Sequence, residues 1–365
     1  MNSITVTTQK AINYGAVLQA LALHKIQGEL GIDNRLLNLP SLSKMFMPIP
    51  KMISKQMLIA CAVNLTHILH LKEQRSLRYK FDRFLSQNIS QTKEYGSIAE
   101  LTNDPPIADF YINGSDQVFG LRGEFDLERM LQFGDEITKR YSYAASLGEY
   151  DWSEEEKKTF ARMIEKFSMI SVREQYAKEY IEGFANVSCE VHVDPVFLLQ
   201  RDEWDAIAAE RIVEEDYILC YPLIGNSDTQ TVLDELKKKT GLKTVCVQTF
   251  PRRRVKADKY IFDAGPEEFL SLFKHAKYIV TTSFHGTAFS LIFEKPFYTM
   301  IKNYKSQRMT DLLNMVGLSE RIYSPEISIN DDDIDFSQCR KIIKEERQRG
   351  IDYLKRVIED ASKKE

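Results

Sequence analysis

Apolar segments alternate with amphipathic ones along most of the chain, in an order typical of α/β proteins. Residues 3–8 alternate polar and apolar positions as a strand does, and residues 16–30 carry apolar side chains at helical spacing. A second strand is predicted at residues 35–39, so the chain begins with a strand–helix–strand unit. Open α/β sheets bind ligands at the carboxyl ends of their strands, and the turn at residues 11–15 lies at such an end.

Further strands are predicted at intervals that leave room for helices between them. In the first half they fall at residues 108–114, 140–145, 169–173 and 191–199, and in the second half at residues 217–223, 243–249, 260–262 and 278–282. Strands that alternate with helices indicate parallel sheets covered by helices on both faces. The predicted fold class is α/β, with two Rossmann-like parallel-sheet domains facing a cleft.

Two domains are expected because a single hydrophobic core stops growing at about 250 to 300 residues, and this chain has 365. The first is predicted at residues 1–199, with a helical insertion at residues 51–88. The second is predicted at residues 200–320, and residues 321–365 form a tail with a long charged helix. The apolar edge of that helix indicates that it packs back across the domains.

Composition narrows the classes of function. The formal net charge of −4 gives no field that would recruit nucleic acid, so no nucleic-acid partner is predicted. Five cysteines without a short Cys-x-x-Cys spacing indicate reduced core residues, not a disulfide framework or a zinc site. The first ten residues lack the basic and apolar regions of a secretory signal, so the expected location is the cytoplasm.

Residues 57–85 raise the question of membrane contact. Residues 57–71 are apolar, but a helix that spans a bilayer needs about twenty residues, more than this stretch supplies. Basic residues interleave with apolar ones over residues 72–85, which predicts a basic amphipathic helix. Two interpretations remain open. Residues 57–85 contact the inner face of an anionic membrane, or the helices pack on their own domain with a solvated basic face.

The turn after the last predicted strand carries a group of polar residues: Ser283, His285, Gly286 and Thr287. A helix begins there, and the first N–H groups of a helix have no internal partner and attract anions. Gly286 would let a ligand approach the backbone, while the hydroxyls and the imidazole offer hydrogen bonds and a proton. We therefore predict a phosphate or carboxylate site. The alternative is that Ser283 or Thr287 caps the helix and His285 is a half-buried structural residue.

Six strings in sequence order carry a resemblance to a known family. They are NYGAVLQ (13–19), GSDQVF (114–119), YAASLG (143–148), SVRE (171–174), DPVFL (194–198) and SFHGTAFS (283–290). With them the chain resembles the polysaccharide pyruvyl transferases from about residue 13 to residue 318. The resemblance implies a GT-B-like fold, phosphoenolpyruvate as donor, and a pair of sugar hydroxyls as acceptor. That acceptor would belong to a cell-surface polysaccharide (exopolysaccharide) or its lipid-linked precursor, and the product would be a pyruvate ketal.

The resemblance also implies roles for individual residues. His285 would be the donor-site histidine, able to bind phosphate and to act as an acid. Asp116 would deprotonate the acceptor, with a turn or helix-cap role as the alternative. Arg173 would pair with the donor carboxylate, for which a guanidinium is suited, with an ion pair to Glu174 or another nearby acid as the alternative. Arg308 would lie near the same cleft.

One departure from the family affects the donor site. Characterised members tend to have an arginine where this chain has Ser283, so one cation is missing. Arg253, in a run of three arginines after a predicted strand, could replace it, and a solvated loop is the alternative. Neither a metal nor a cofactor is predicted. The acceptor side is predicted to be lined by Asn13, Tyr14, Gly15, Ser115 and Gln117.

Two other functions remain open. A GT-B glycosyltransferase that uses a nucleotide sugar would need the same phosphate-binding turn and a carboxylate for the ribose, which Glu267 or Glu268 could supply. Acids at the start of a helix more often complement its dipole. A non-catalytic glycan-assembly protein would keep the fold and lack the donor site.

Overall fold

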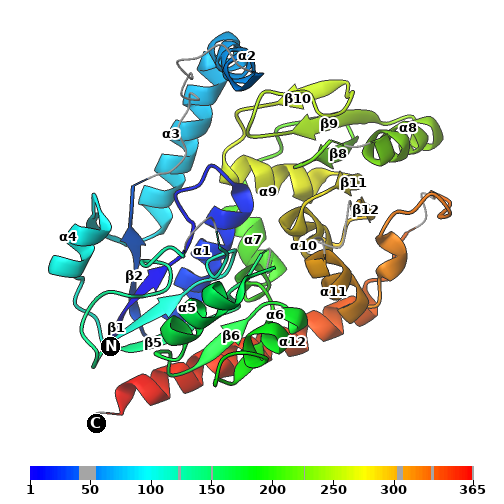
Figure 1. The fold of residues 1–365 in the computed structure, drawn as a ribbon. Coiled ribbons are helices and arrows are strands. Elements are labelled where there is room, and N and C mark those ends of the chain that lie inside the picture. The colour runs from blue at the N-terminus through cyan, green and yellow to red at the C-terminus, as the bar shows by residue number, and fades with distance from the viewer. Residues whose placement is uncertain are drawn as a thin grey trace.

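A computed structural model of the protein describes residues 1–40, 55–121, 125–148, 151–225, 227–301, 307–329 and 333–363. These residues form two five-stranded parallel sheets and a smaller two-stranded one, with helices packed around them (Figure 1). The predicted fold class, two parallel-sheet α/β domains, is therefore confirmed.

The first sheet has the strand order β3-β2-β1-β4-β5. Its strands are β1 (Asn2–Val6), β2 (Asp33–Asn38), β3 (Gln91–Glu94), β4 (Phe110–Asn113) and β5 (Lys139–Ser142). The order reverses at β1 and β4, which are paired with Val6 opposite Asn113. The loops that leave these two strands therefore start side by side, at the point where α/β sheets bind ligands.

Smaller elements complete the first half of the molecule. They are α1 (Tyr14–Glu29), α4 (Ile98–Asn103), α5 (Glu154–Ile164), β6 (Ile170–Val172), α6 (Gln175–Glu182), β7 (Cys189–Val191), the 3-10 turn η1 (Pro195–Phe197) and α7 (Arg201–Ile207). The helix α1 is buried along most of its length between the sheet and the second domain, which explains its broad apolar stripe.

The second sheet repeats the arrangement with the order β10-β9-β8-β11-β12. Its strands are β8 (Tyr217–Tyr221), β9 (Lys243–Val247), β10 (Lys259–Ile261), β11 (Tyr278–Thr281) and β12 (Phe297–Thr299). Its helices are α8 (Ser227–Thr240), α9 (Pro266–His275), α10 (Phe284–Ile292) and α11 (Gln307–Met315), followed by the 3-10 turn η3 (Ser319–Arg321). Because the order reverses at β8 and β11, α10 starts at the switch point of this sheet.

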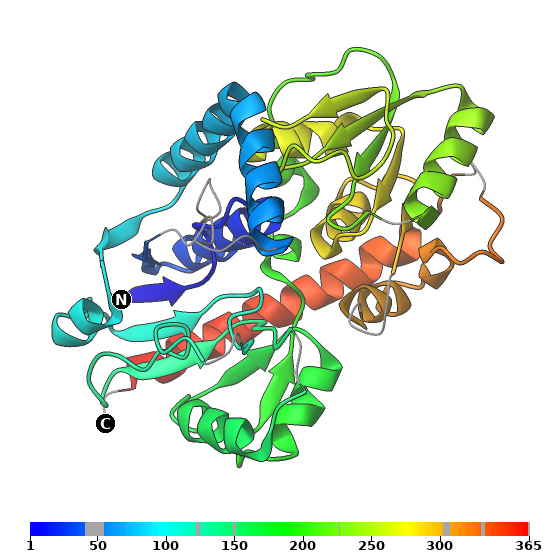
Figure 2. The ribbon, with the colours of Figure 1, turned by 45° about the horizontal axis from the view of Figure 1, so that its top comes forward.

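The predicted helical insertion consists of α2 (Lys55–Leu69) and α3 (Leu71–Asn88), and its residues 51–54 lie outside the described part of the chain. The basic residues of α3 do not form a fully solvated face. Lys80 lies 2.8 Å from Glu268 and Arg83 lies 2.9 Å from Glu267, so α3 packs on α9 of the second domain (Figure 2). The predicted alternative, in which the insertion packs on its own domain with a solvated basic face, is therefore wrong at Lys80 and Arg83.

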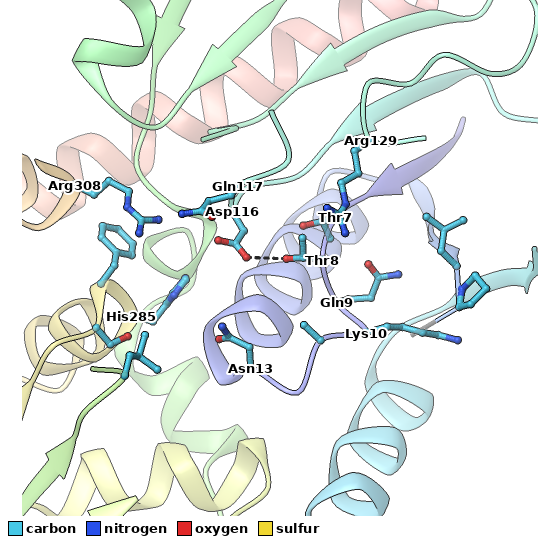
Figure 3. A pocket seen from close by; sticks show the side chains of 16 residues that line it. Thr7, Thr8, Gln9, Lys10, Asn13, Asp116, Gln117, Arg129, His285 and Arg308 are labelled. Carbon is cyan, nitrogen blue, oxygen red and sulfur yellow. Dashed lines mark hydrogen bonds between the residues drawn. The ribbon is translucent and has the colours of Figure 1, made fainter. Parts of the chain in front are cut away.

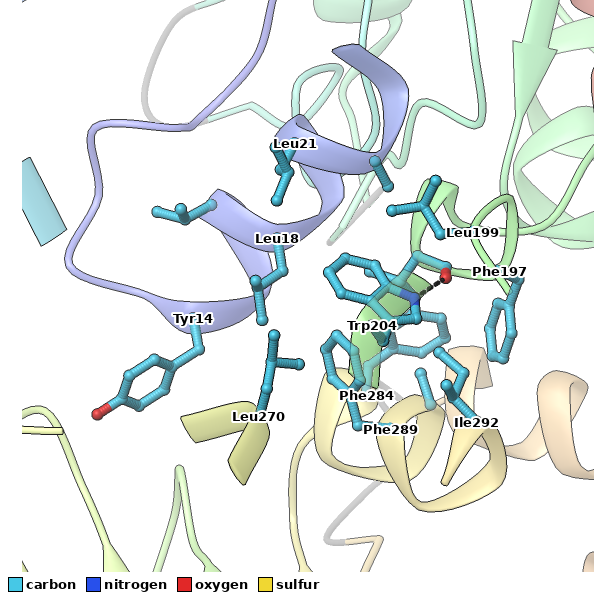
Figure 4. Packing of buried hydrophobic residues seen from close by; sticks show 14 of the residues in the cluster. Tyr14, Leu18, Leu21, Phe197, Leu199, Trp204, Leu270, Phe284, Phe289 and Ile292 are labelled. Atoms are coloured by element: carbon cyan, nitrogen blue, oxygen red, sulfur yellow. Dashed lines mark hydrogen bonds between the residues drawn. The ribbon is translucent and has the colours of Figure 1, made fainter. Parts of the chain in front are cut away.

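One hydrophobic core joins the two halves. In Figure 4, Tyr14 and Leu18 from α1 lie beside Leu270 from α9, with Phe289 of α10 and Trp204 of α7 nearby. The ring of Tyr14 is fully buried and stacks on Phe269 with 4.1 Å between centroids. Its hydroxyl donates to the carbonyl of Ala264 at 2.8 Å. Tyr14, expected to line the acceptor side, therefore belongs to the interface between the domains.

The C-terminal helix α12 (Ser337–Ser362) runs along both halves, as the pattern of its apolar edge predicts (red in Figure 2). At one end Arg340 pairs with Glu294, which follows α10, at 2.9 Å. Further along, the hydroxyl of Tyr353 donates to the carbonyl of Ser142 at 2.9 Å, in the first sheet. No helix in the described part of the chain combines the length and the apolar character needed to cross a membrane.

Candidate active site

A cavity of about 340 Å³ lies where the two domains meet, open to solvent on one side. Its size falls in the range of small-molecule sites, roughly 300 to 1,000 Å³. The loops after β1 and β4 form one wall and the start of α10 forms the other (Figure 3). The polar and charged side chains along it are Thr7, Thr8, Gln9, Lys10, Asn13, Asp116, Gln117, Arg129, Ser283, His285 and Arg308.

Asp116 is the third residue after β4, and its backbone has a positive φ of 74°. Such a conformation is uncommon for a residue with a side chain, although aspartate and asparagine tolerate it best. It persists because the surroundings fix it: its carbonyl accepts from Ser146, and the hydroxyl of Thr8 donates to its carboxylate at 2.8 Å. Backbone strain of this kind clusters at functional sites.

The carboxylate of Asp116 is held in its ionised form. Burial alone would raise its pKa, but the charges of Arg173, His285 and Arg308 and the hydrogen bond from Thr8 outweigh that effect and lower it. Asp116 can therefore accept a hydrogen bond or a proton at neutral pH.

The start of α10 has features of both predicted roles, a helix cap and an anion site. Ser283 is the cap, because its hydroxyl accepts from the N–H of Gly286 at 3.3 Å, which uses that donor. The N–H groups of Phe284 and His285 in the first turn have no hydrogen-bond partner among the described residues. They remain available to an anion in the cavity.

Two residues predicted at the donor site have structural contacts instead. The hydroxyl of Thr287 donates to the carbonyl of Ser283 at 3.1 Å and contacts Thr299 at 2.8 Å, and it is fully buried. A Cβ on Gly286 would lie 2.2 Å from the hydroxyl oxygen of Thr281, so glycine is needed there for packing against β11, not for ligand approach.

The imidazole of His285 is held between the two domains. Its Nε2 lies 3.5 Å from the carboxylate of Asp194, without the alignment of a hydrogen bond. On its other side it packs on α1, where a Cβ on Gly15 would lie only 2.0 Å from Nδ1. Gly15, predicted to line the acceptor side, therefore makes room for the histidine.

Asp194 is the centre of a buried ionic cluster behind the histidine. Nη1 of Arg173 donates to it at 2.6 Å, the hydroxyl of Ser115 donates at 3.1 Å, and Nε of Arg173 contacts Glu174 at 3.0 Å. Burial would raise the pKa of Asp194, but His285 and Arg173 lower it well below its usual range. Arg173 and Ser115 do not line the cavity. The predicted alternative for Arg173, an ion pair with Glu174 or another nearby acid, is the observed one, because Arg173 pairs with both Glu174 and Asp194.

Arg308 supplies a cation on the second-domain side of the cavity. Its guanidinium lies 6.0 Å from the ring centre of Phe284, and no carboxylate in the described part of the chain pairs with it. Burial lowers its pKa, and the nearby charge of Arg173 adds to that effect. The charges of Glu174 and Asp116 oppose this lowering, but neither acid forms an ion pair with Arg308 in the described part of the chain, so its N–H donors can serve an anionic ligand.

Comparison with known proteins adds to this geometry. The sequence matches the polysaccharide pyruvyl transferases over residues 13–304, most of the chain. The chain belongs to the polysaccharide pyruvyl transferase family. The protein is accordingly an enzyme of that kind, and no curated protein matches it.

Solved structures show the fold of this pyruvyl transferase family member. UDP-GlcNAc 2-epimerase from Neisseria meningitidis, bound to UDP-GlcNAc, is 12% identical with a TM-score of 0.50, covering 100% of this chain and 95% of that one. The epimerase from Methanocaldococcus jannaschii is 13% identical with a TM-score of 0.48, covering 96% and 91%. The likeness to the Neisseria enzyme agrees with a GT-B-like arrangement of two Rossmann-type domains and says nothing about substrate.

Other predicted residues of this pyruvyl transferase family member fall inside and outside the cavity. Asn13 lines it and caps α1, accepting from the N–H of Gly15 at 3.0 Å, and Gln117 lines it as well. Arg253 does not line it, because its guanidinium stacks over the ring of Tyr260 at 4.8 Å. Lys10 and Arg129 line it and were not predicted, since neither lies in one of the family strings.

The acids considered for ribose binding are engaged elsewhere. Glu267 pairs with Arg83, and Glu268 pairs with Lys80 while accepting from the N–H of Gly265. Among the residues that the structure describes, no three His, Cys, Asp or Glu side chains are grouped to hold a metal ion.

Proposed function

We propose that this enzyme transfers a pyruvyl group from phosphoenolpyruvate to a pair of hydroxyls on a sugar of a cell-surface polysaccharide or its lipid-linked precursor. The observation that carries the proposal is the pairing, in one cavity, of an anion-binding wall around His285 and Arg308 with the ionised carboxylate of Asp116. The reaction needs these parts, because the donor is a multiply charged anion and the acceptor must lose protons.

The second-domain wall suits the donor. Phosphoenolpyruvate carries a phosphate and a carboxylate, and the free N–H groups at the start of α10 can hold one of them. Arg308 offers a planar guanidinium for bidentate contact with the other. Arg253, the predicted replacement for the family arginine absent at Ser283, does not line the cavity, so Arg308 is the cation proposed for the donor.

The proposed chemistry runs in balanced steps. His285 gives a proton to the methylene carbon of the donor, which becomes a methyl group and leaves an electrophilic carbon beside the phosphate oxygen. One sugar hydroxyl bonds to that carbon while its proton passes to Asp116, and the carbon–oxygen bond to phosphate then breaks. The second hydroxyl then bonds to the same carbon and closes the ketal. Its proton returns to His285, and the proton held by Asp116 leaves with the phosphate, so both residues regain their starting states.

The lowered pKa makes Asp116 a weak base, but a weak base is enough to remove the proton of the acceptor hydroxyl. The hydroxyl becomes strongly acidic once its oxygen bonds to a cationic carbon, so the proton moves late in the step. The hydrogen bond from Thr8 keeps Asp116 in position for that transfer.

We also propose peripheral contact with the cytoplasmic face of a membrane through α2. Four of its apolar side chains, Leu58, Leu65, Ile68 and Leu69, are 57 to 73% exposed and recur at helical spacing. Residues 34–72 contain no acidic residue, so nothing in this stretch repels anionic lipids. The apolar face of α2 replaces the basic face of α3 as the contact surface, because Lys80 and Arg83 of α3 are paired with α9.

The test is to incubate the protein with phosphoenolpyruvate labelled in the pyruvyl carbons and a mixture of lipid-linked saccharides, and to weigh the products. A saccharide that gains the mass of one pyruvyl ketal, with release of phosphate, is the expected result. Thermal-shift measurements with phosphoenolpyruvate and with UDP-GlcNAc provide a second arm, because a bound ligand raises the midpoint. Stabilisation by the nucleotide sugar alone would favour glycosyl transfer, and stabilisation by neither would favour a non-catalytic role.

A further inference from the structure

The cavity has a second cationic end that the proposed donor site does not use. In Figure 3, Arg129, Gln9 and Lys10 lie on the opposite side of the Thr8–Asp116 hydrogen bond from His285 and Arg308. All three belong to the first domain and line the same cavity. The acceptor must lie on this side of Asp116 if the donor occupies the other wall.

Gln9 presents an unused hydrogen-bond acceptor at this end. Its side chain is 2% exposed, and its amide nitrogen donates to the carbonyl of Leu37 at 2.7 Å, which fixes the orientation of the amide. The amide oxygen, Oε1, is buried and has no hydrogen-bond partner. A buried acceptor without a donor is costly, so this oxygen is suited to accept from a hydroxyl of a ligand.

Arg129 presents unused donors beside it. Its Nη1 pairs with Asp126 at 2.5 Å, and no other guanidinium N–H forms a hydrogen bond to a described residue. An arginine has five N–H donors, so most of its capacity for a planar anion remains. Lys10 lines the same end and pairs with Glu94, whose carboxylate is exposed, at 3.3 Å.

We propose that this end, called here the acceptor-anion subsite and formed by Gln9, Lys10 and Arg129, binds an acidic acceptor. Arg129 binds a carboxylate or phosphate attached to the saccharide, and Gln9 accepts from one of its hydroxyls. The reacting hydroxyl pair then faces Asp116. This inference rests on the proposed pyruvyl transfer and specifies its acceptor as an acidic saccharide, not a neutral one.

The negative group could be the carboxylate of a uronic acid or a phosphate that joins the sugar to a carrier. The two share the chemistry that Arg129 recognises, a planar pair or a cluster of anionic oxygens. Leu39 and Pro40 line the same end and offer an apolar surface for the carbon face of a sugar ring.

The experiment is calorimetric titration of the full chain with glucuronic acid, glucose 1-phosphate and methyl glucoside, each with and without phosphoenolpyruvate. We expect one of the two acidic sugars to bind about tenfold or more tightly than methyl glucoside, as a charged hydrogen bond implies. Which of them binds more tightly distinguishes the carboxylate from the phosphate source. Binding of all three within about twofold, or of none at millimolar concentration, would overturn the inference.

Variants of Arg129 make the test specific. In Arg129→Gln the affinity for the acidic sugar should fall to that of methyl glucoside, and Arg129→Lys should give an intermediate value, while the affinity for phosphoenolpyruvate stays unchanged. Arg253→Gln removes the same charge outside the cavity and should change nothing. Weaker phosphoenolpyruvate binding by Arg129→Gln would place the donor at this end and overturn the inference. Failure of the wild-type chain to bind phosphoenolpyruvate would instead count against the proposed function.

Discussion

The Cα of Gly15 lies so close to the ring of His285 that a Cβ would reach within 2.0 Å of Nδ1. The first residues of α1 therefore set the position of a side chain that comes from the second domain. Since Asp194 contacts Nε2 of the same ring at 3.5 Å, the histidine is confined from two sides. This contact makes the candidate site a product of both domains.

We expect Gly15→Ala to abolish transfer, because the added methyl group must displace the imidazole or separate the domains. Overpacking of this kind costs typically 1–3 kcal/mol, which a lowered midpoint of urea unfolding would show. The matched control is Gly28→Ala in the same helix, where a Cβ meets nothing within 4 Å. That change should keep activity and add about 0.5–1 kcal/mol of stability. Full activity in Gly15→Ala would mean that the position of His285 does not matter.

Arg308→Gln should raise the KM for phosphoenolpyruvate by about ten- to a hundredfold, since a charged hydrogen bond to the donor is lost. The measurement is phosphate release over a range of donor concentrations. Arg253→Gln serves as the control, because Arg253 stacks on Tyr260 away from the cavity. The reverse pattern, a large effect at Arg253 and none at Arg308, would assign the missing cation to the loop.

Asp116→Asn should lower kcat by about a hundredfold or more while leaving donor affinity intact, as expected for loss of a general base. Asparagine has the same shape and tolerates the positive φ of this residue, so the fold should be preserved. Single-turnover rates and donor binding measured on the same sample separate the two effects. Unchanged kcat would exclude the carboxylate from the chemical step.

Stability should fall between about pH 6.5 and pH 4 because of His192, a buried residue. Burial lowers the pKa of His192 from 6.5 to about 4, although Glu190 opposes the shift and Arg349 and Arg356 add to it. The unfolded chain therefore binds a proton in this window and the folded one does not, which favours unfolding by up to about 3 kcal/mol as the pH falls. Urea unfolding at several pH values checks this.

The control for this pH dependence is His192→Asn, which keeps a polar group near the hydroxyl of Ser171, the partner of Nδ1 at 2.9 Å. We expect the variant to be less stable at neutral pH and to lose little further stability down to pH 4. A parallel decline in both proteins would assign the acid sensitivity to other groups, such as the buried carboxylates.

Binding to vesicles with anionic lipid should depend on the exposed face of α2. Leu65→Gln combined with Leu69→Gln should reduce co-flotation severalfold, because two exposed apolar side chains are lost. Substitution of two equally apolar residues elsewhere, Ile107→Ser with Ile137→Ser, should not. Equal partitioning of both variants would remove α2 from the membrane contact.

Local patterns were enough to predict the two parallel sheets, because the spacing of apolar residues over a short stretch distinguishes a strand from a helix. They also located the turns of Asp116 and His285, since glycine and polar residues interrupt the apolar runs there. An ion pair of Arg173 with Glu174 or another nearby acid was predicted, but the sequence could not identify Asp194 as the second acid. Asp194 reaches Arg173 only because β6 and β7 pair, which depends on contacts far apart in the chain.

Cavity residues without a local signal were missed for the same reason. Arg129 follows no strand and resembles any surface arginine in sequence, and Lys10 lies in a loop whose path depends on the whole sheet. Conversely, Tyr14 was predicted to contact the ligand because it is next to Asn13 in the sequence. As the first residue of α1, however, it points its side chain into the core.

The packing of α12 has a consequence for synthesis of the protein. Tyr353, Leu354 and Val357, near the end of the chain, complete the core against strand β5 and its neighbours. Domains made first on the ribosome usually fold first. Here part of the core of the N-terminal half stays uncovered until residues 353–357 emerge, so a chain that stalls before them would expose apolar surface that chaperones would have to protect.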